Sequence, residues 1–115
     1  MLNVKEKGIL LYIIDYCKRI EKKVTGITRQ SFDENLDISE IVCFNILQIG
    51  ELAKKLSVDF IEQYNGVPWK NIKGMRDKVA HEYGTIDYDQ IWNAATKDIK
   101  VLREYCEQVL KENDD

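Results

Sequence analysis

The sequence has 115 residues, of which 44% are hydrophobic and 32% charged, and its formal net charge is −3 at pH 7. This length predicts one domain spanning residues 1–115, and the slight acidity gives no bulk electrostatic argument for nucleic-acid binding. No apolar run approaches the roughly 20 residues that span a bilayer, and we find no signal peptide, so we expect a cytoplasmic protein without a membrane partner.

The first predicted helix covers residues 8–24. Its apolar residues recur at steps of three and four, which is typical of a helix with one buried face. They are Leu10, Ile13, Ile14, Cys17, Ile20 and Val24. We expect a break over residues 25–30, with Gly26 capping the helix, and then a short helical turn over residues 31–36.

A second long helix is expected over Asp37–Leu56. Its start has the pattern of a capping box, with Asp37 as the N-cap and Glu40 at the third helical position. Its apolar residues lie on more than one face, and such a helix has to be buried on more than one side. The pattern predicts packing inside a bundle and also against a second subunit, hence a homodimer. Asn45, which interrupts the apolar run, is interpreted as forming an interhelical hydrogen bond.

Two further helices complete the chain. After a short turn over residues 57–64, Pro68 suits the first position of a third long helix that ends near Gly84. Asp87 is a candidate N-cap for a last helix over residues 88–111. Because no strand pattern competes, the sequence predicts an all-α fold: an antiparallel up-and-down four-helix bundle with short extra helical turns.

The three cysteines, Cys17, Cys43 and Cys106, are widely spaced and lie in apolar helical settings. They are interpreted as buried free thiols in a reducing compartment. With only one histidine in the chain, their spacing does not match a metal-ligand cluster, so we expect neither a metal site nor a cofactor.

The segment from Gly74 to Tyr83 contains that histidine, His81, five residues after Arg76. Arginine presents a fixed fork of donors to phosphate oxygens, and histidine titrates near neutral pH and can move a proton. Because RNA supplies its own nucleophile, the 2′-hydroxyl, this pair suits metal-independent phosphodiester cleavage. The alternative role for a lone histidine near a helix C-terminus is to stabilise that helix end.

A regular helix places Arg76 and His81 about 140° apart around its axis, so they do not converge on one substrate atom by themselves. Either the helix loosens between Ala80 and Gly84, or a second copy of the segment supplies the missing partner across a two-fold axis. Arg76 and Tyr83, by contrast, lie within about 20° of each other.

Three lysines lie in this segment or just before it: Lys70, Lys73 and Lys78. Together with Arg76 they place four positive charges within nine residues, against Asp77 alone. The three lysines are therefore candidate RNA-binding residues, and the alternative is an ordinary solvated helix face.

Arg76, His81 and Tyr83 resemble the R-x-x-x-x-H-x-Y motif of the HEPN superfamily. The surrounding sequence is similar to the HepT-like branch over nearly the whole chain: Asn45-x-x-x-x-Gly50-Glu51-x-Ala53-Lys54-Lys55-Leu56, then Val67-Pro68-Trp69-Lys70-x-Ile72-x-Gly74-Met75-Arg76, then Asp87 and Ile91-Trp92. The short motif alone is weak, but its combination with the Pro-Trp-basic and Gly-Met-Arg context is specific.

The resemblance implies a helical homodimer in which two copies of the motif meet in a cleft. It implies a metal-independent endoribonuclease with Arg76 and His81 as the catalytic pair and tRNA among the substrate classes. It further implies the toxin of a type VII-like toxin–antitoxin pair, whose antitoxin is an MNT-type nucleotidyltransferase that transfers AMP from ATP onto Tyr83. Glu82 differs from the residue often found between the motif His and Tyr, and it places an acid beside the site.

A second hypothesis is a non-catalytic HEPN module that serves as the regulatory subunit of a nucleotidyltransferase. The presence of both Arg76 and His81 favours the ribonuclease, whereas the net acidity favours the binding module weakly. A neighbouring gene for a nucleotidyltransferase with a Gly-Ser and paired-Asp signature is the observation that would help most.

Overall fold

The computed structural model describes residues 2–85 and 87–114, and within them every regular element is helical. In chain order these are α1 (Val4–Val24), α2 (Arg29–Glu34), α3 (Leu36–Lys54), α4 (Val58–Gln63), α5 (Trp69–Glu82), η1 (Tyr83–Thr85), α6 (Tyr88–Asn93), η2 (Ala94–Asp98) and α7 (Ile99–Glu112). The all-α prediction is confirmed. Of the helices described, none is long and apolar enough to cross a membrane.

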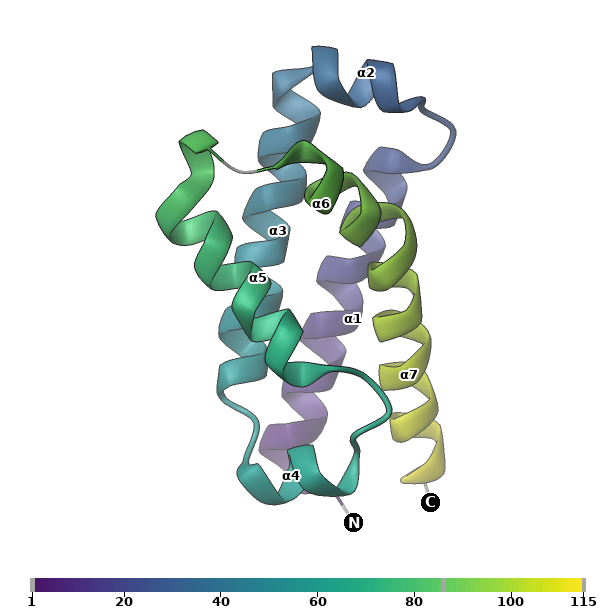
Figure 1. The fold of residues 1–115 in the computed structure, drawn as a ribbon. Helices are drawn as coiled ribbons and strands as arrows, with labels where there is room; N and C mark the ends of the chain where they lie inside the picture. The colour runs from purple at the N-terminus through teal and green to yellow at the C-terminus, as the bar shows by residue number, and fades with distance from the viewer. Residues whose placement is uncertain (1, 86, 115) are drawn as a thin grey trace.

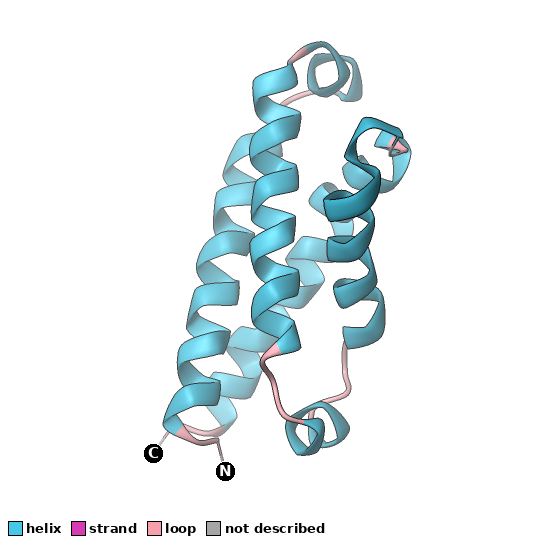
Figure 2. Ribbon diagram, turned by 90° about the vertical axis from the view of Figure 1, so that its left-hand side faces the viewer, coloured by secondary structure: helices cyan, strands magenta, loops and turns pink. Residues whose placement is uncertain are grey.

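Four long helical units stand side by side and alternate in direction: α1, α3, α5 and the unit made of α6, η2 and α7 (Figure 1). α1 packs against both α3 and α7, whereas α5 packs mainly against α3. The short helices α2 and α4 lie at opposite ends of the bundle, and the connections are short loops (Figure 2). This arrangement is the predicted antiparallel bundle with short extra helical turns.

The predicted apolar stripe of the first helix and a similar stripe of the last helical unit form much of the core. All six stripe residues of α1 are buried, and so are Ala95, Ile99, Leu102, Cys106 and Val109 of the last unit. The three cysteines are free and buried, as predicted. Burial raises the pKa of the Cys43 thiol to about 11 and that of Cys106 to about 12, and it also raises that of Cys17. The thiols therefore stay protonated and unreactive at neutral pH.

The capping box predicted for α3 is wrong. The N-cap is Asn35, whose side-chain oxygen accepts a hydrogen bond from the backbone N–H of Ile38 at 3.3 Å. Asn35 also ends α2, where its own N–H donates to the carbonyl of Ser31 at 3.1 Å. Because Asn35 ends α2 and begins α3, Asp37 lies inside the first turn of α3. Its negative charge there interacts favourably with the positive end of the helix dipole.

α3 buries one broad face and leaves part of another uncovered. Val42, Ile46 and Ile49 are buried, whereas Ile41 is 36% exposed and Phe44 is 56% exposed. The surface of the single chain therefore keeps an apolar strip on α3, and the homodimer stays a prediction.

Asn45 does not form the expected interhelical hydrogen bond. Its Nδ2 donates to the carbonyl of Ile41, one turn earlier in the same helix, at 2.7 Å. Its Oδ1 has no hydrogen-bond partner among the described residues, although the side chain is buried. A buried acceptor left in this state costs on the order of 1–3 kcal/mol, so Asn45 does not stabilise the bundle through this group.

The last helical unit contains a π-helical turn, η2, that the apolar periodicity did not indicate. Its start is as predicted, because the side chain of Asp87 accepts a hydrogen bond from the N–H of Asp89 at 2.8 Å. Farther along, Thr96 Oγ1 donates to the carbonyl of Trp92 at 2.7 Å. A threonine that bonds one turn back competes for a carbonyl of the helix ladder, which accounts for the wider turn at this point.

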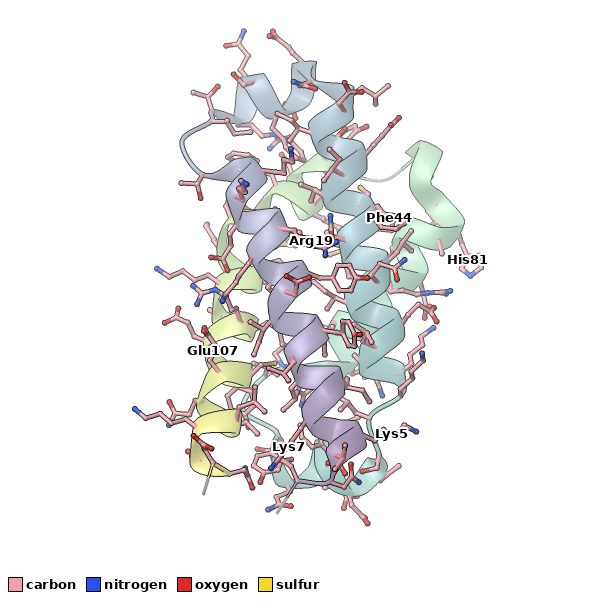
Figure 3. The ribbon with its side chains drawn as sticks, turned by 180° about the vertical axis from the view of Figure 1, so that it is seen from behind. Lys5, Lys7, Arg19, Phe44, His81 and Glu107 are labelled. Atoms are coloured by element: carbon pink, nitrogen blue, oxygen red, sulfur yellow. The ribbon has the colours of Figure 1, made fainter. Side chains whose placement is uncertain are left out.

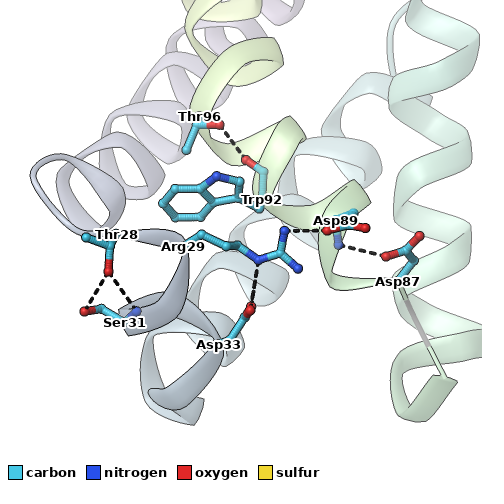
Figure 4. A network of polar contacts seen from close by, with 8 residues as sticks. All are labelled: Thr28, Arg29, Ser31, Asp33, Asp87, Asp89, Trp92 and Thr96. Atoms are coloured by element: carbon cyan, nitrogen blue, oxygen red, sulfur yellow. Dashed lines mark hydrogen bonds and ion pairs between the residues drawn. The ribbon is translucent and has the colours of Figure 1, made fainter.

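Contacts between α2 and α6 fix where this last unit begins. Arg29 Nε donates to Asp33 on its own helix at 2.8 Å, and Arg29 Nη1 reaches Asp89 of α6 (Figure 4). Phe32, which is fully buried, packs with its ring centroid 5.1 Å from that of Trp92. These contacts hold the start of α6 against α2.

Two glycines, one inside α1 and one just after its end, test the helical assignment. A Cβ added at Gly8, inside α1, would meet no atom within 4 Å. Since glycine in a helix interior costs about 0.5–1 kcal/mol relative to alanine, we expect Gly8→Ala to raise the free energy of unfolding by that amount in urea titrations. Gly26→Ala is the matched control and should destabilise, because Gly26 caps α1 with φ at +82°. Equal effects of the two substitutions would contradict the assignment of Gly8 to the interior of α1 and of Gly26 to its C-terminal cap.

Candidate functional site

The segment with Arg76 and His81 lies on α5, which begins directly after Pro68. The fixed φ of proline suits a helix start, and the Pro68 carbonyl accepts the N–H of Ile72 at 3.1 Å. Trp69 and Val79 are buried, so they mark the face of α5 that points toward the core. α5 thus presents one side to the bundle and leaves the other for external contacts.

α5 makes a very close approach to α3 at Arg76. A Cβ added at Gly50 of α3 would lie 2.1 Å from the Arg76 Cβ and 2.7 Å from its Cγ. Only glycine, which has no Cβ, lets the two helices come this near. The aliphatic stem of Arg76 is therefore packed on α3, and its side chain is only 25% exposed.

The guanidinium of Arg76 is held by acids from both helices. Its Nε forms an ion pair with Oε1 of Glu51 on α3, and its Nη1 lies 3.1 Å from Oδ1 of Asp77. The same oxygen of Asp77 accepts a hydrogen bond from Lys54 of α3 at 2.7 Å. The bond from Lys54, followed by the bond from Arg76, lowers the pKa of Asp77, so this carboxylate stays ionised at neutral pH.

His81 lies on the side of α5 that faces away from the core. It is exposed, and Figure 3 shows its ring pointing away from the bundle. α5 remains α-helical through Glu82, and the 3₁₀ turn begins only at Tyr83. Because the change of pitch comes after His81, it does not turn this residue toward Arg76, and the two stay about 140° apart. Loosening of the helix therefore does not bring the pair together within one chain.

The three candidate lysines are not equivalent. Lys70 and Lys78 are exposed and line a cavity of about 640 Å³ between α3, α5 and the last helical unit. Lys78 also donates a hydrogen bond to Gln90 of α6 at 3.4 Å. Lys73 is half-buried and does not line this cavity. The structure therefore brings Lys70 and Lys78 to a common opening but separates Lys73 from them.

The end of the motif carries a further acid. Glu82 is exposed and adds negative charge close to His81. Tyr83 is the first residue of η1, and its side chain lies outside the described part of the structure. The relation of its hydroxyl to Arg76 stays a prediction.

Sequence reasoning did not find the network in which Glu51 and Asp77 pair with Arg76 and Lys54 pairs with Asp77. In the sequence, Glu51 and Lys54 stand out only as parts of the family pattern, and Asp77 only as the acid among four positively charged residues. Their pairing depends on the register between α3 and α5, which the close contact at Gly50 sets and which no spacing within one helix reveals. Within residues 2–85 and 87–114, no group of three or more His, Cys, Asp and Glu side chains is arranged to hold a metal ion.

Comparison with known proteins places the chain in a family. Residues 13–109 match the family model described as "Ribonuclease HepT-like". The chain is 33% identical over 102 residues to a "Putative RNase" of Caldanaerobacter subterraneus subsp. tengcongensis, covering 89% of this chain and 91% of that protein. It is 31% identical over 106 residues to a "Putative RNase" of Methanocaldococcus jannaschii, covering 92% and 88%.

A "Probable ribonuclease HepT" of Thermococcus cleftensis is 28% identical over 104 residues, covering 87% of this chain and 94% of that protein. No solved structure matches the chain. The family match begins within α1, ends within α7 and includes Arg76, His81 and Tyr83. The chain therefore belongs to the HepT-like ribonuclease family, as the motif and its surroundings predict.

Proposed function

We propose that this protein is an endoribonuclease that cleaves RNA without a metal ion, using Arg76 and His81. The 2′-hydroxyl oxygen attacks the adjacent phosphorus, the P–O5′ bond breaks, and a 2′,3′-cyclic phosphate and a 5′-hydroxyl form. His81 moves protons, and Arg76 stabilises the charge that develops on the phosphate oxygens. The observation that carries the proposal is a firmly held Arg76 and an exposed His81 on one helix of a HepT-like ribonuclease.

We further propose that the active form is a homodimer with a shared site. α3 and α5 are antiparallel and Gly50 faces Arg76, so residues before Gly50 lie alongside residues after Arg76. Phe44 therefore lies at about the level of His81 (Figure 3), and it is 56% exposed. Covering Phe44 with a second copy of the chain would stabilise the dimer by burying apolar surface. It would also bring the Arg76 and His81 of the second copy close to those of the first.

The dimer also meets a chemical requirement. Cleavage needs a base for the proton of the 2′-hydroxyl and an acid for the leaving 5′-oxygen. Each chain has a single histidine. In each of the two sites of the dimer, His81 of one chain accepts the proton of the 2′-hydroxyl and passes a proton to the leaving 5′-oxygen, beside Arg76 of the other chain. Lys70 and Lys78 supply phosphate contacts that hold the strand without reading its sequence.

The chemistry has a direct product test. Purified protein treated with excess EDTA should cleave RNA at an unchanged rate and leave 2′,3′-cyclic phosphate ends, because the nucleophile belongs to the RNA. Mass spectrometry of the fragments identifies these ends, and an oligonucleotide with a 2′-deoxy residue at the cleaved position is the matched control. Complete loss of cleavage with chelator, or cleavage of the 2′-deoxy control, would contradict the mechanism.

We propose that the partner is an MNT-type nucleotidyltransferase antitoxin that attaches AMP to Tyr83. On co-expression with an MNT-type nucleotidyltransferase, we expect the intact mass to increase by one or more AMP units that map to Tyr83, together with loss of cleavage. The added phosphate brings negative charge and bulk to the motif and competes with RNA phosphate for Arg76. Tyr83→Phe is the control; inhibition that persists in it without a mass change would show an antitoxin that acts by binding alone.

The proposed setting is the cytoplasm, with RNA, including tRNA, as the substrate class. A purified protein that binds the nucleotidyltransferase but leaves RNA intact under all these conditions would favour the regulatory subunit instead.

A further inference from the structure

We infer that Glu51 positions Arg76 for catalysis: its carboxylate, on α3, fixes the orientation of the guanidinium on α5. This inference rests on the proposed function. Glu51 does not need to contact RNA, so it is a positioning residue and its effect passes through Arg76.

The contact between Glu51 and Arg76 crosses between α3 and α5 next to the close approach at Gly50. Gly50, the residue before Glu51, has no side chain and lets α5 rest on the backbone of α3. The backbone of Glu51 is therefore held in place by the packing of α3 against α5, and its carboxylate reaches Arg76 from this position. The Nε of Arg76 is buried against Glu51 Oε1 as an ion pair without a well-directed N–H bond. A buried charged atom with one counter-ion depends strongly on that counter-ion.

Asp77 is less suited to this role. It follows Arg76 on the same helix, so it moves with α5, and its side chain is 51% exposed. It is also shared with Lys54 of α3, which donates to the same oxygen at 2.7 Å. Glu51 is thus the acid that ties the guanidinium itself to the neighbouring helix.

The pairing leaves one edge of Arg76 for substrate. Nε faces Glu51 and Nη1 faces Asp77, while no ion pair is found for Nη2 among the described residues. Two nearby carboxylates weaken the general attraction of Arg76 for phosphate, so binding does not depend mainly on this residue. Removing Glu51 should therefore lower the rate of the chemical step through lost orientation, while RNA binding stays unchanged or tightens slightly.

The test compares Glu51→Gln with Glu21→Gln. Glu21 Oε1 pairs with Arg103 Nε at 2.7 Å between α1 and α7, so the control breaks an interhelical pair of the same atoms and removes the same charge. We expect Glu51→Gln to lower kcat about ten- to hundredfold with KM within threefold of wild type, because small misplacement of a catalytic group is costly. Glu21→Gln should leave both constants unchanged, and Glu51→Gln should cause no further loss in an Arg76→Ala background.

A second readout does not need activity. The Nε–H resonance of Arg76, identified by its absence in Arg76→Lys, should shift and exchange faster with water in Glu51→Gln. Glu21→Gln should instead move the resonance of Arg103. If wild type cleaves RNA and Glu51→Gln matches Glu21→Gln in kcat and leaves the Arg76 resonance in place, the inference is wrong while the proposed function stands. If wild type does not cleave RNA, the proposed function fails, and the resonance alone decides whether Glu51 orients Arg76.

Discussion

Arg76→Ala and His81→Ala variants should each lose about 10²- to 10⁴-fold in cleavage rate, and a mixture of the two should regain activity. The loss follows from removing the group that stabilises phosphate charge or the group that moves protons. The recovery follows from geometry, because the two side chains point about 140° apart on a regular α5 and do not meet within one chain.

Recovery depends on how subunits combine. A dimer with one Arg76→Ala chain and one His81→Ala chain has one site with both substitutions and one site with both native residues. Random exchange makes about half of the dimers mixed, so the mixture should reach about a quarter of wild-type activity. The measurement is cleavage of a fluorescent RNA after the variants are co-refolded, with subunit mixing followed by light scattering.

The control is a mixture of Arg76→Ala with the double variant Arg76→Ala/His81→Ala, which can form no native site and should stay inactive. Dimers that mix freely without recovery would mean that Arg76 and His81 of one chain act together. A protein that remains monomeric at micromolar concentration would remove the shared site altogether.

Gly50→Ala should damage both stability and activity. The new Cβ would lie 2.1 Å from the Arg76 Cβ and 3.4 Å from its Cα, so α3 and α5 have to move apart. Overpacking of this kind costs about 1–3 kcal/mol or more in the free energy of unfolding. Because the shift occurs at Arg76, we also expect cleavage to fall by up to about 10²-fold under conditions where the variant is folded.

Urea unfolding and cleavage assays of the same preparation separate the two effects, and Gly8→Ala is the control for a glycine-to-alanine change inside a helix. A Gly50→Ala protein with wild-type stability and rate would show that α5 does not pack on α3 in this register.

Most of the fold could be predicted because its signals are local. The apolar spacing of α1 and α7, the turn at Gly26 and the cap at Asp87 each depend on a few neighbouring residues. The start of α3 was misplaced because Asn35 serves two helices at once, and the π turn was missed because it depends on one hydroxyl, that of Thr96. The motif identified Arg76 and His81, but the ion pair with Glu51 depends on how two distant helices align.

The cavity between α5 and the last helical unit affects how easily α5 can detach from the bundle. α5 rests mainly on α3, and the cavity of about 640 Å³ separates it from much of the last helical unit. Detaching α5 would break its contact with α3 but leave α1, α3 and α7 packed on one another. Such a segment opens at a lower free energy than the whole domain, so the backbone amides of α5 belong to a separate, earlier-exchanging unit than those of α1.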